Sequence, residues 1–323
     1  MSSTAHPVLL VHGGAGEIRR DMDTDTRRAI RASLREALGR GYETLLSGQT
    51  AVDAAAAAVT VLEDAPHFNA GRGSVFTHDG RNEMDAAIME GATRRAGAVA
   101  GIECIRNPVL LARAVMEHSP HVMLAGRGAE AFANECGIER AEPDYFRTEH
   151  RWQQLQEAQR REDAGTSEDD QAGGYYGTVG AVALDAHGHL AAATSTGGMT
   201  DKRWGRIGDS PVIGGGTYAD AACAVSGTGW GEYYIRSAAA HAICMRVGSW
   251  GNRPSRPPQR SSTRTYPAWA ATAAPSCSLP TGVSRCRSAR RACTAAGSAP
   301  TARRTWRSSS RRSRTRADLA GRV

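Results

Sequence analysis

The sequence predicts a layered α/β domain that is interrupted by one long loop. Three observations lead to this prediction. Segments with the period of helices and segments with the period of strands follow one another in mixed order over the first 250 residues. An acidic, glycine-rich stretch from about residue 161 to residue 176 divides them and has the composition of an exposed, mobile linker. The hydrophobic content of 41% suits a globular chain of 323 residues, in which sheets and helices bury their apolar faces in layers.

The first elements form a strand and two helices. Residues 8–11 are an apolar strand that runs into His12-Gly13-Gly14-Ala15-Gly16, a turn that needs the backbone freedom of glycine. Apolar side chains then recur at a helical period, at Ile30, Leu34, Leu38, Tyr42 and Leu45. Thr50 and Asp53 have the spacing of a capping box, so a second, alanine-rich helix is expected from there to about Leu62.

The later elements alternate between strands and helices on both sides of the linker. Before it, we expect two strands and a turn over Ser74 to Met89, and helices over about 107–117, 127–135 and 148–161. After it, Val179 to Leu184 and Leu190 to Ala193 flank the turn Asp185-Ala186-His187-Gly188, which predicts a hairpin. A strand over Cys223 to Ser226 and a helix over about Glu232 to Met245 follow.

Composition excludes several classes of protein. No apolar run approaches the roughly 20 residues that a membrane helix needs, and the first residues lack the pattern of a signal peptide, so a cytoplasmic location is expected. The seven cysteines are odd in number and form no CxxC pair, which argues against a disulfide framework or a zinc site.

The positive charge is confined to the last part of the chain. Residues 251–323 contain 16 arginines and one acid, whereas residues 1–250 contain 24 basic and 32 acidic residues. This tail has only four residues of the Val, Leu, Ile, Met and Phe types, so it cannot bury enough apolar surface to offset its ordering entropy. Disorder or misfolding is therefore expected for residues 251–323, whereas residues 1–250 form an acidic body.

Gly177-Thr178 is the candidate for nucleophilic chemistry. A threonine hydroxyl needs an adjacent base, and a threonine at a chain terminus can use its own α-amino group. Here the linker meets an apolar strand at Thr178, which is the arrangement that self-cleavage requires. On its own, the pair also fits an ordinary β-branched residue at the start of a strand.

The surrounding motifs resemble one enzyme family. GTVGAVALDAHGHLAAATSTGGMTDKRWGRIGDSPVIGGGTYAD (177–220) and AVSGTGWGEYYIR (224–236) resemble the start of the small subunit of isoaspartyl peptidase/L-asparaginase enzymes. VHGGAG (11–16) and FNAGRGSVFTHDGRNEMDAAIMEG (68–91) resemble their large subunit, and the motifs occur in the family's order from about residue 8 to residue 246.

This resemblance implies an N-terminal nucleophile hydrolase with four αββα layers. Self-cleavage between Gly177 and Thr178 would give a large subunit, 1–177, and a small subunit that begins with 178–246, with two copies of each in the assembly. Thr178 would supply the nucleophile and the base, and Thr196 would orient it. Thr228 and the Gly229 amide would form the oxyanion hole.

The resemblance also implies a substrate site and an ion site. Arg206 would bind the substrate α-carboxylate, and Asp209 with the Gly231 carbonyl would bind the α-ammonium group. Asn69 would lie near the nucleophile. No cofactor is implied for catalysis, but a loop would hold a structural sodium ion through backbone carbonyls, here those of Leu62, Glu63, Ala65, Phe68, Ala70 and Arg72.

The tail, 247–323, departs from the family pattern. A cationic nucleic-acid-binding tail, a low-complexity interaction tail and a shifted reading frame are three explanations. The third fits best, because residues 268–275, reverse-translated and read from each third base, permit Leu-Gly-Gly-Asp-Gly-Gly-Ala. The same shift over Arg287 to Gly297 permits Phe-Ser-Thr-Ala-Gly-Met-Tyr-Arg-Gly-Trp, so two missing family motifs return in order. We place the frame change between codons 246 and 260.

The function that the resemblance implies is hydrolysis of β-aspartyl dipeptides and, with lower preference, of L-asparagine, through a β-aspartyl ester on Thr178. Its partners would be these small molecules and copies of itself, with no membrane and no nucleic acid. A glycosylasparaginase is the nearest enzyme alternative. An inactive remnant, or a protein whose cationic tail binds nucleic acid, is the alternative from another class.

Overall fold

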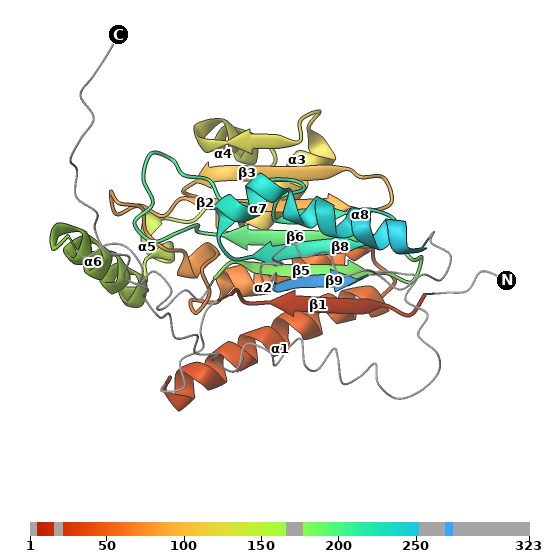
Figure 1. Ribbon diagram of the computed structural model, residues 1–323, viewed down its shortest axis with the longest axis horizontal. Helices are drawn as coiled ribbons and strands as arrows, with labels where there is room; N and C mark the ends of the chain where they lie inside the picture. The colour runs from red at the N-terminus through yellow and green to blue at the C-terminus, as the bar shows by residue number, and fades with distance from the viewer. Residues whose placement is uncertain (1–4, 16–21, 166–176, 252–268, 274–323) are drawn as a thin grey trace, which may run out of the picture.

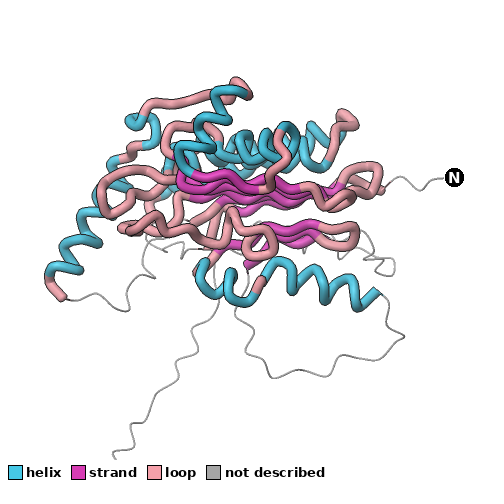
Figure 2. The backbone as a smooth tube through the Cα atoms, turned by 90° about the horizontal axis from the view of Figure 1, so that it is seen from above, coloured by secondary structure: helices cyan, strands magenta, loops and turns pink. Residues whose placement is uncertain are grey.

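Two β-sheets lie face to face in the computed structural model of the chain, and helices cover both outer faces (Figure 2). The structure describes residues 5–15, 22–165, 177–251 and 269–273. The elements in chain order are β1 (Val8–His12), α1 (Thr24–Leu46), α2 (Ala51–Asp64), the 3₁₀ turn η1 (Gly71–Gly73), β2 (Met84–Glu90), β3 (Ala96–Ile102), α3 (Pro108–His118), β4 (Met123–Ala125), α4 (Gly126–Glu135), α5 (Pro143–Phe146), α6 (Glu149–Asp163), β5 (Val179–Leu184), β6 (Leu190–Thr196), β7 (Thr217–Ala219), β8 (Ala224–Thr228), α7 (Gly231–Ser237), α8 (Ala239–Gly251) and β9 (Trp269–Ala273).

The larger sheet has the strand order β1-β5-β6-β2-β3-β4, and only its β3–β4 pair is parallel. The smaller sheet has the order β7-β8-β9 and is antiparallel. Helices α2 and α3 pack on the outer face of the larger sheet, whereas α8 packs on β7 and β8 (Figure 1). Strands β5 and β6 contact β8 between the sheets. The predicted α/β fold with four αββα layers is therefore the fold of the described chain.

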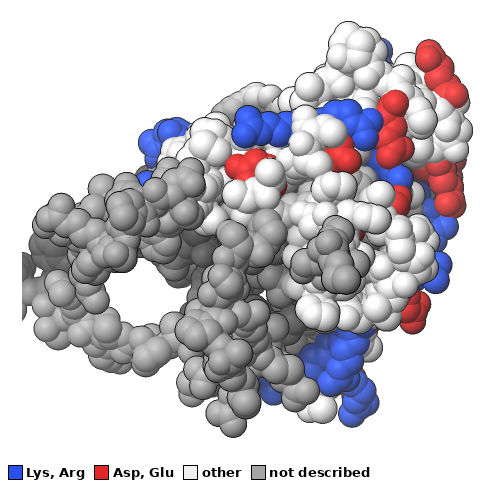
Figure 3. Space-filling view, turned by 90° about the vertical axis from the view of Figure 1, so that its right-hand side faces the viewer, with Lys and Arg blue, Asp and Glu red and all other residues white. Residues whose placement is uncertain are grey.

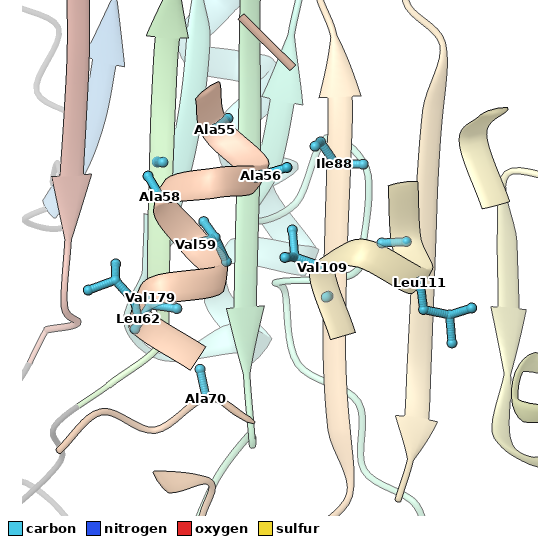
Figure 4. Packing of buried hydrophobic residues seen from close by; sticks show 14 of the residues in the cluster. Ala55, Ala56, Ala58, Val59, Leu62, Ala70, Ile88, Val109, Leu111 and Val179 are labelled. Carbon is cyan, nitrogen blue, oxygen red and sulfur yellow. The ribbon is translucent and has the colours of Figure 1, made fainter. Parts of the chain in front are cut away.

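Helix α2 lies close to the larger sheet because its inner face consists of small residues. Thr50 and Asp53 form the predicted capping box, in which Thr50 Oγ1 accepts the Asp53 N–H and the Asp53 carboxylate accepts the Thr50 N–H. Ala54, Ala55, Ala56 and Ala58 are fully buried, and Val59 and Leu62 lie beside Val179 of β5 (Figure 4). The helix thus supports the strand that follows Thr178.

The β5–β6 hairpin sets the position of the candidate nucleophile. Asp185 closes its turn, because Asp185 Oδ1 accepts the N–H groups of His187 and His189, at 2.9 and 3.0 Å. Asp185 Oδ2 also accepts the N–H of Ala51, which ties the turn to the start of α2. The resulting register pairs Val179 with Ser195 and therefore brings the preceding Thr178 to the end of β6.

The structure corrects three predicted boundaries. Residues 74–83 form a loop rather than a strand, since the Asn82 side chain, and not a neighbouring strand, donates to the carbonyls of Ser74 and Val75. The helix predicted over 232–245 is broken at Ala238, whose φ of 44° is left-handed and ends α7. The predicted linker begins later than residue 161, because α6 continues to Asp163, and residues 166–176 lie outside the described part.

One strand forms within the arginine-rich tail, where the sequence analysis expected none. The backbone of Trp269–Ala273 pairs with β8 from Thr228 to Ala224 as strand β9. A strand pairs through backbone hydrogen bonds along the edge of its neighbour, so this short segment can pair although the tail as a whole is poor in large apolar residues. The rest of the tail beyond Gly251, and the codons where we place the frame change, lie largely outside the described residues.

Charges of both signs share the surface of the body. Basic and acidic side chains lie next to one another on the face seen in Figure 3. Several arginines are paired with acids, as in Arg81–Glu103 at 2.7 Å and Arg203–Glu162 at 2.6 Å. Such exposed pairs contribute little to stability, about 0–1 kcal/mol each, but they neutralise the arginines locally.

Candidate functional site

Thr178 lies at the start of β5 and forms a hydrogen bond to the end of β6. Its Oγ1 donates to Thr196 Oγ1 over 3.0 Å, and the same Thr196 oxygen accepts the N–H of Gly198, also at 3.0 Å. Thr196 is 2% exposed, so these contacts are shielded from water. Two of the three threonines that were predicted to be catalytic, Thr178 and Thr196, are therefore adjacent.

Asn69 holds the turn that follows β6. Its Nδ2 donates to the Gly198 carbonyl at 2.7 Å, its Oδ1 accepts the N–H of Val75 at 3.0 Å, and its backbone carbonyl accepts the N–H of Gly197 at 3.1 Å. A Cβ on Gly197 would lie 2.5 Å from Asn69 Oδ1, so the turn admits no side chain. Asn69 thus fixes Gly197 and Gly198, and the Gly198 N–H bonds to Thr196 Oγ1.

The HGGAG turn covers the predicted cleavage point. Gly14 has a φ of 108°, and a Cβ there would lie 2.2 Å from the Gly177 nitrogen. The neighbouring Ala15 N–H donates to Thr228 Oγ1 at 3.2 Å. Thr228 Oγ1 also lies close to Gly177, because a Cβ built on Gly177 would be 3.2 Å from this oxygen. The strands β1, β5 and β8 therefore bring the turn, the Gly177–Thr178 bond and Thr228 together.

Arg206, Asp209 and Gly231 form a second group of predicted site residues. A Cβ on Gly231 would lie 2.8 Å from Arg206 Nη2 and 3.0 Å from Asp209 Oδ1, so the three are in contact around this glycine. Arg206 Nε and Nη2 donate to both carboxylate oxygens of Glu232, at 2.9 and 3.0 Å. This bidentate pair holds the guanidinium in place. Glu232 is a residue that sequence reasoning missed.

Asp209 is a buried carboxylate that is 5% exposed. Burial raises its pKa to about 6, against the opposing effects of a backbone hydrogen bond and the Arg206 charge. Among the residues that the structure describes, none donates a hydrogen bond to Asp209 Oδ2. A carboxylate with an unpaired oxygen is suited to accept from a cationic group.

Two buried groups of opposite charge, Asp85 and Lys202, influence one another near the end of β6. Asp85 of β2 is opposite Thr196 in the strand register and accepts the Gly101 N–H at 2.9 Å. Burial raises the pKa of Asp85 and lowers that of Lys202, while their opposite charges act against both shifts. The Lys202 Nζ donates to the Glu83 carbonyl at 2.8 Å. Sequence reasoning missed this pair, although Lys202 is the single lysine in a chain with 39 arginines.

A chain of hydroxyl groups runs between the two sheets beside β5. His12 Nε2 and Ser226 Oγ share a hydrogen bond of 2.9 Å, Ser226 and Thr194 share one of 2.7 Å, and Thr217 continues the chain at 2.7 Å. Burial lowers the pKa of His12 to about 4, although the Thr178 backbone opposes this shift, so the ring is neutral at physiological pH. The position of His12 in the HGGAG motif was the only sequence signal for it.

The loop predicted to hold sodium gathers backbone carbonyls. Gly71 has a φ of 51°, and a Cβ on it would lie 2.4 Å from the Glu63 carbonyl oxygen. A Cβ on Gly73 would lie 2.1 Å from the carbonyl oxygen of Phe68. Glu63 and Phe68 are two of the six predicted ligands, and the others lie in the last turn of α2, in the loop that follows it or in η1: Leu62, Ala65, Ala70 and Arg72. A carbonyl-lined loop of this kind fits a hard monovalent cation.

A different cluster of possible metal ligands already contains a cation. His78, Glu162 and Asp201 lie within reach of one another. Arg203 Nη2 donates to Glu162 Oε2 at 2.6 Å and lies 3.0 Å from His78 Nδ1. The Arg203 guanidinium therefore supplies the positive charge that a metal ion would bring to these acids.

Comparison with known proteins identifies the family. The sequence profile of the family described as Asparaginase matches residues 5–269. The chain is 49% identical over 251 residues to the isoaspartyl peptidase of Escherichia coli (strain K12), covering 76% of this chain and 78% of that protein. It is 45% identical over 233 residues to the isoaspartyl peptidase/L-asparaginase of Homo sapiens, covering 72% and 73%. It is 44% identical over 238 residues to the plant-type L-asparaginase of Pyrococcus abyssi (strain GE5 / Orsay), covering 72% and 76%. With the predicted motifs present in one folded domain, the chain belongs to this asparaginase family.

Proposed function

We propose that the chain is a self-cleaving threonine amidohydrolase that removes isoaspartyl residues from β-aspartyl dipeptides and hydrolyses L-asparagine to L-aspartate and ammonia. The observation that carries the proposal is the 3.0 Å hydrogen bond between Thr178 and Thr196 at a glycine–threonine bond enclosed by Gly14. The names of the three relatives above agree with this activity.

The chemistry begins with cleavage of the peptide bond between Gly177 and Thr178. The freed α-amine of Thr178 then accepts the proton of its own hydroxyl as Oγ attacks the side-chain carbonyl of the substrate. Thr196 orients Oγ. The oxyanion accepts hydrogen bonds from the Thr228 hydroxyl and the Gly229 N–H. Ammonia or the dipeptide's second residue leaves with a proton, and water hydrolyses the β-aspartyl ester to release L-aspartate.

The acyl group is recognised by the cluster around Gly231. The substrate α-carboxylate binds the guanidinium of Arg206, which its pairing with Glu232 holds rigid. The substrate α-ammonium binds Asp209 and the Gly231 carbonyl. Because β-aspartyl dipeptides and L-asparagine present the same acyl group, one cluster serves both substrates.

Two further features belong to this proposal. The backbone carbonyls of Leu62, Glu63, Ala65, Phe68, Ala70 and Arg72 would hold a sodium ion, which would stiffen the segment that contains Asn69. The mature protein contains two large and two small subunits. None of the helices in the described ranges is long and apolar enough to span a bilayer.

Intact-mass spectrometry together with an activity assay tests the proposed function. The purified full chain should yield a fragment that begins at Thr178, and it should release aspartate from a β-aspartyl dipeptide. Thr178→Ala should remain uncut and inactive, whereas Thr93→Ala, at an exposed turn, should behave like the wild type. An uncut wild-type chain, or hydrolysis of glycosylated asparagine in preference to the dipeptide, would contradict the proposal. In protein expressed from the original source gene, the mass of the fragment that begins at Thr178 also decides whether the printed tail or the shifted frame is real.

A further inference from the structure

Tyr234 of α7 contacts the loop that ends β8. Its hydroxyl donates to the Thr228 carbonyl oxygen over 3.0 Å. Its ring lies against the glycines on either side of Thr228, because a Cβ on Gly227 would lie 2.7 Å, and one on Gly229 3.0 Å, from ring carbons. Neither glycine could carry a side chain without moving this ring.

The bonded carbonyl belongs to the peptide group that carries the Gly229 N–H. A trans peptide is planar, with its C=O and N–H pointing in opposite directions, so fixing the Thr228 carbonyl also fixes the direction of the Gly229 N–H. The peptide needs such a restraint, because Gly229 has a φ of 153°, in a region that glycine enters and leaves at little cost. A hydrogen bond to the carbonyl also polarises the N–H of the same peptide.

The phenol is suited to this donor role at any working pH. Burial, with a contribution from the Asp209 charge, raises the pKa of Tyr234 to about 12. The hydroxyl therefore keeps its proton. Glu232 lies on α7 with Tyr234 and pairs with Arg206 of the proposed substrate cluster, to which Asp209 also belongs. Helix α7 therefore connects that cluster to the loop around Gly229.

We propose that Tyr234 is a positioning residue that aims the Gly229 N–H at the oxyanion formed during hydrolysis. The inference rests on the proposed function for the role of that N–H. It goes beyond the function because Tyr234 touches no reacting atom and acts through the Thr228–Gly229 peptide alone. The stabilisation acts on the tetrahedral intermediate and on the transition states on either side of it, because neither the bound substrate nor the ester carries the oxyanion.

The test compares Tyr234→Phe with the wild type in the full chain. The phenylalanine keeps the ring against Gly227 and Gly229 and removes the hydrogen bond to Thr228. Loss of an entire oxyanion donor costs about 10²–10³ in kcat, so loss of its alignment should lower kcat about 10-fold with KM nearly unchanged. Tyr145→Phe is the matched control, because it removes a hydroxyl that donates to Asp64 at 2.8 Å elsewhere in the domain.

Hydrogen exchange supplies a readout that does not depend on activity. Amides over residues 227–231 should exchange several-fold faster in Tyr234→Phe and at the wild-type rate in Tyr145→Phe. Unchanged exchange in this segment would overturn the inference, and so would faster exchange with a wild-type kcat or with a change confined to KM. If the wild-type chain matures but hydrolyses no β-aspartyl substrate, the proposed function fails, and the exchange of this segment alone decides whether Tyr234 restrains it.

Discussion

The hydroxyl groups of Thr178 and Thr196 are joined by a hydrogen bond of 3.0 Å although 18 residues separate them in the chain. The β5–β6 hairpin brings them together, and Asp185 fixes that hairpin's turn from 11 residues before Thr196. The Gly198 N–H donates to Thr196 Oγ1, and the Gly198 carbonyl accepts a hydrogen bond from Asn69 Nδ2. The orientation of the Thr178 hydroxyl therefore depends on a continuous set of backbone and amide contacts.

Thr196→Val should lower kcat about 10- to 100-fold with a small change in KM, because the valine keeps the shape of the side chain and loses the partner of Thr178 Oγ1. Steady-state kinetics with a β-aspartyl dipeptide measures the effect. Thr196→Ser keeps the hydroxyl and should retain most of the activity. Equal losses in both variants would contradict an orienting role for this hydroxyl.

Gly14→Ala should slow or abolish cleavage at Gly177–Thr178, because the new methyl group would overlap the Gly177 backbone at a φ of 108°. The cut fraction, followed by gel electrophoresis over time, measures this rate. Gly39→Ala is the control, since a Cβ on this glycine of α1 meets no atom within 4 Å. Cleavage of Gly14→Ala at the wild-type rate would show that the turn does not control the bond.

Asp209→Asn should stabilise the fold and remove substrate binding. The pKa of Asp209 in the folded state is about 6, above its ordinary value of 3.8, so the folded protein favours the protonated carboxyl. This contribution to stability is fully present below pH 3.8 and is lost as the pH rises through 6. The neutral amide avoids this loss, which amounts to at most about 3 kcal/mol at pH 8.

Denaturant unfolding at pH 8 compares Asp209→Asn with Asp79→Asn, whose carboxylate is 72% exposed. Only the first should raise the free energy of unfolding. In the wild type, KM for L-asparagine should rise as the pH falls below 6, because the protonated Asp209 no longer attracts the substrate ammonium. A KM that is independent of pH between 5 and 7 would argue against this contact.

His12→Gln should reduce the acid sensitivity of the fold. The folded-state pKa of about 4 lies below the ordinary value of 6.5, so neutral His12 favours folding above pH 6.5, and that contribution is lost as the pH falls to 4. The loss is at most about 3 kcal/mol. The difference in unfolding free energy between the wild type and His12→Gln, measured by denaturant unfolding between pH 4 and pH 7, should therefore shrink in acid. A difference that does not change with pH would contradict this effect of His12.

The sequence predicted those parts of the fold that depend on local patterns. The capping box at Thr50 and Asp53, the hairpin around Asp185 and most helix spans are encoded within a few residues, and the structure confirms them. The break at Ala238 was not predictable, because alanine favours helix and gives no local signal for a left-handed conformation.

The candidate site shows the same division. Thr178, Thr196, Asn69 and the substrate cluster were located through family motifs. Glu232, Lys202 and Tyr234 were missed because their roles depend on partners in other segments: Arg206 is 26 residues from Glu232, and the Glu83 carbonyl is 119 residues from Lys202. For Tyr234 the partner is close in sequence, but the contact depends on how α7 leaves β8.

The strand order of the larger sheet decides what a cut between Gly177 and Thr178 can do to the molecule. Strands β5 and β6 come from the C-terminal side of that bond, yet they lie between β1 and β2, which come from the N-terminal side. The two fragments are thus interleaved and joined by antiparallel ladders along both borders. Neither fragment could dissociate without breaking the backbone hydrogen bonds of the sheet. Both fragments of one molecule would therefore come from a single folded precursor and would not exchange between molecules afterwards.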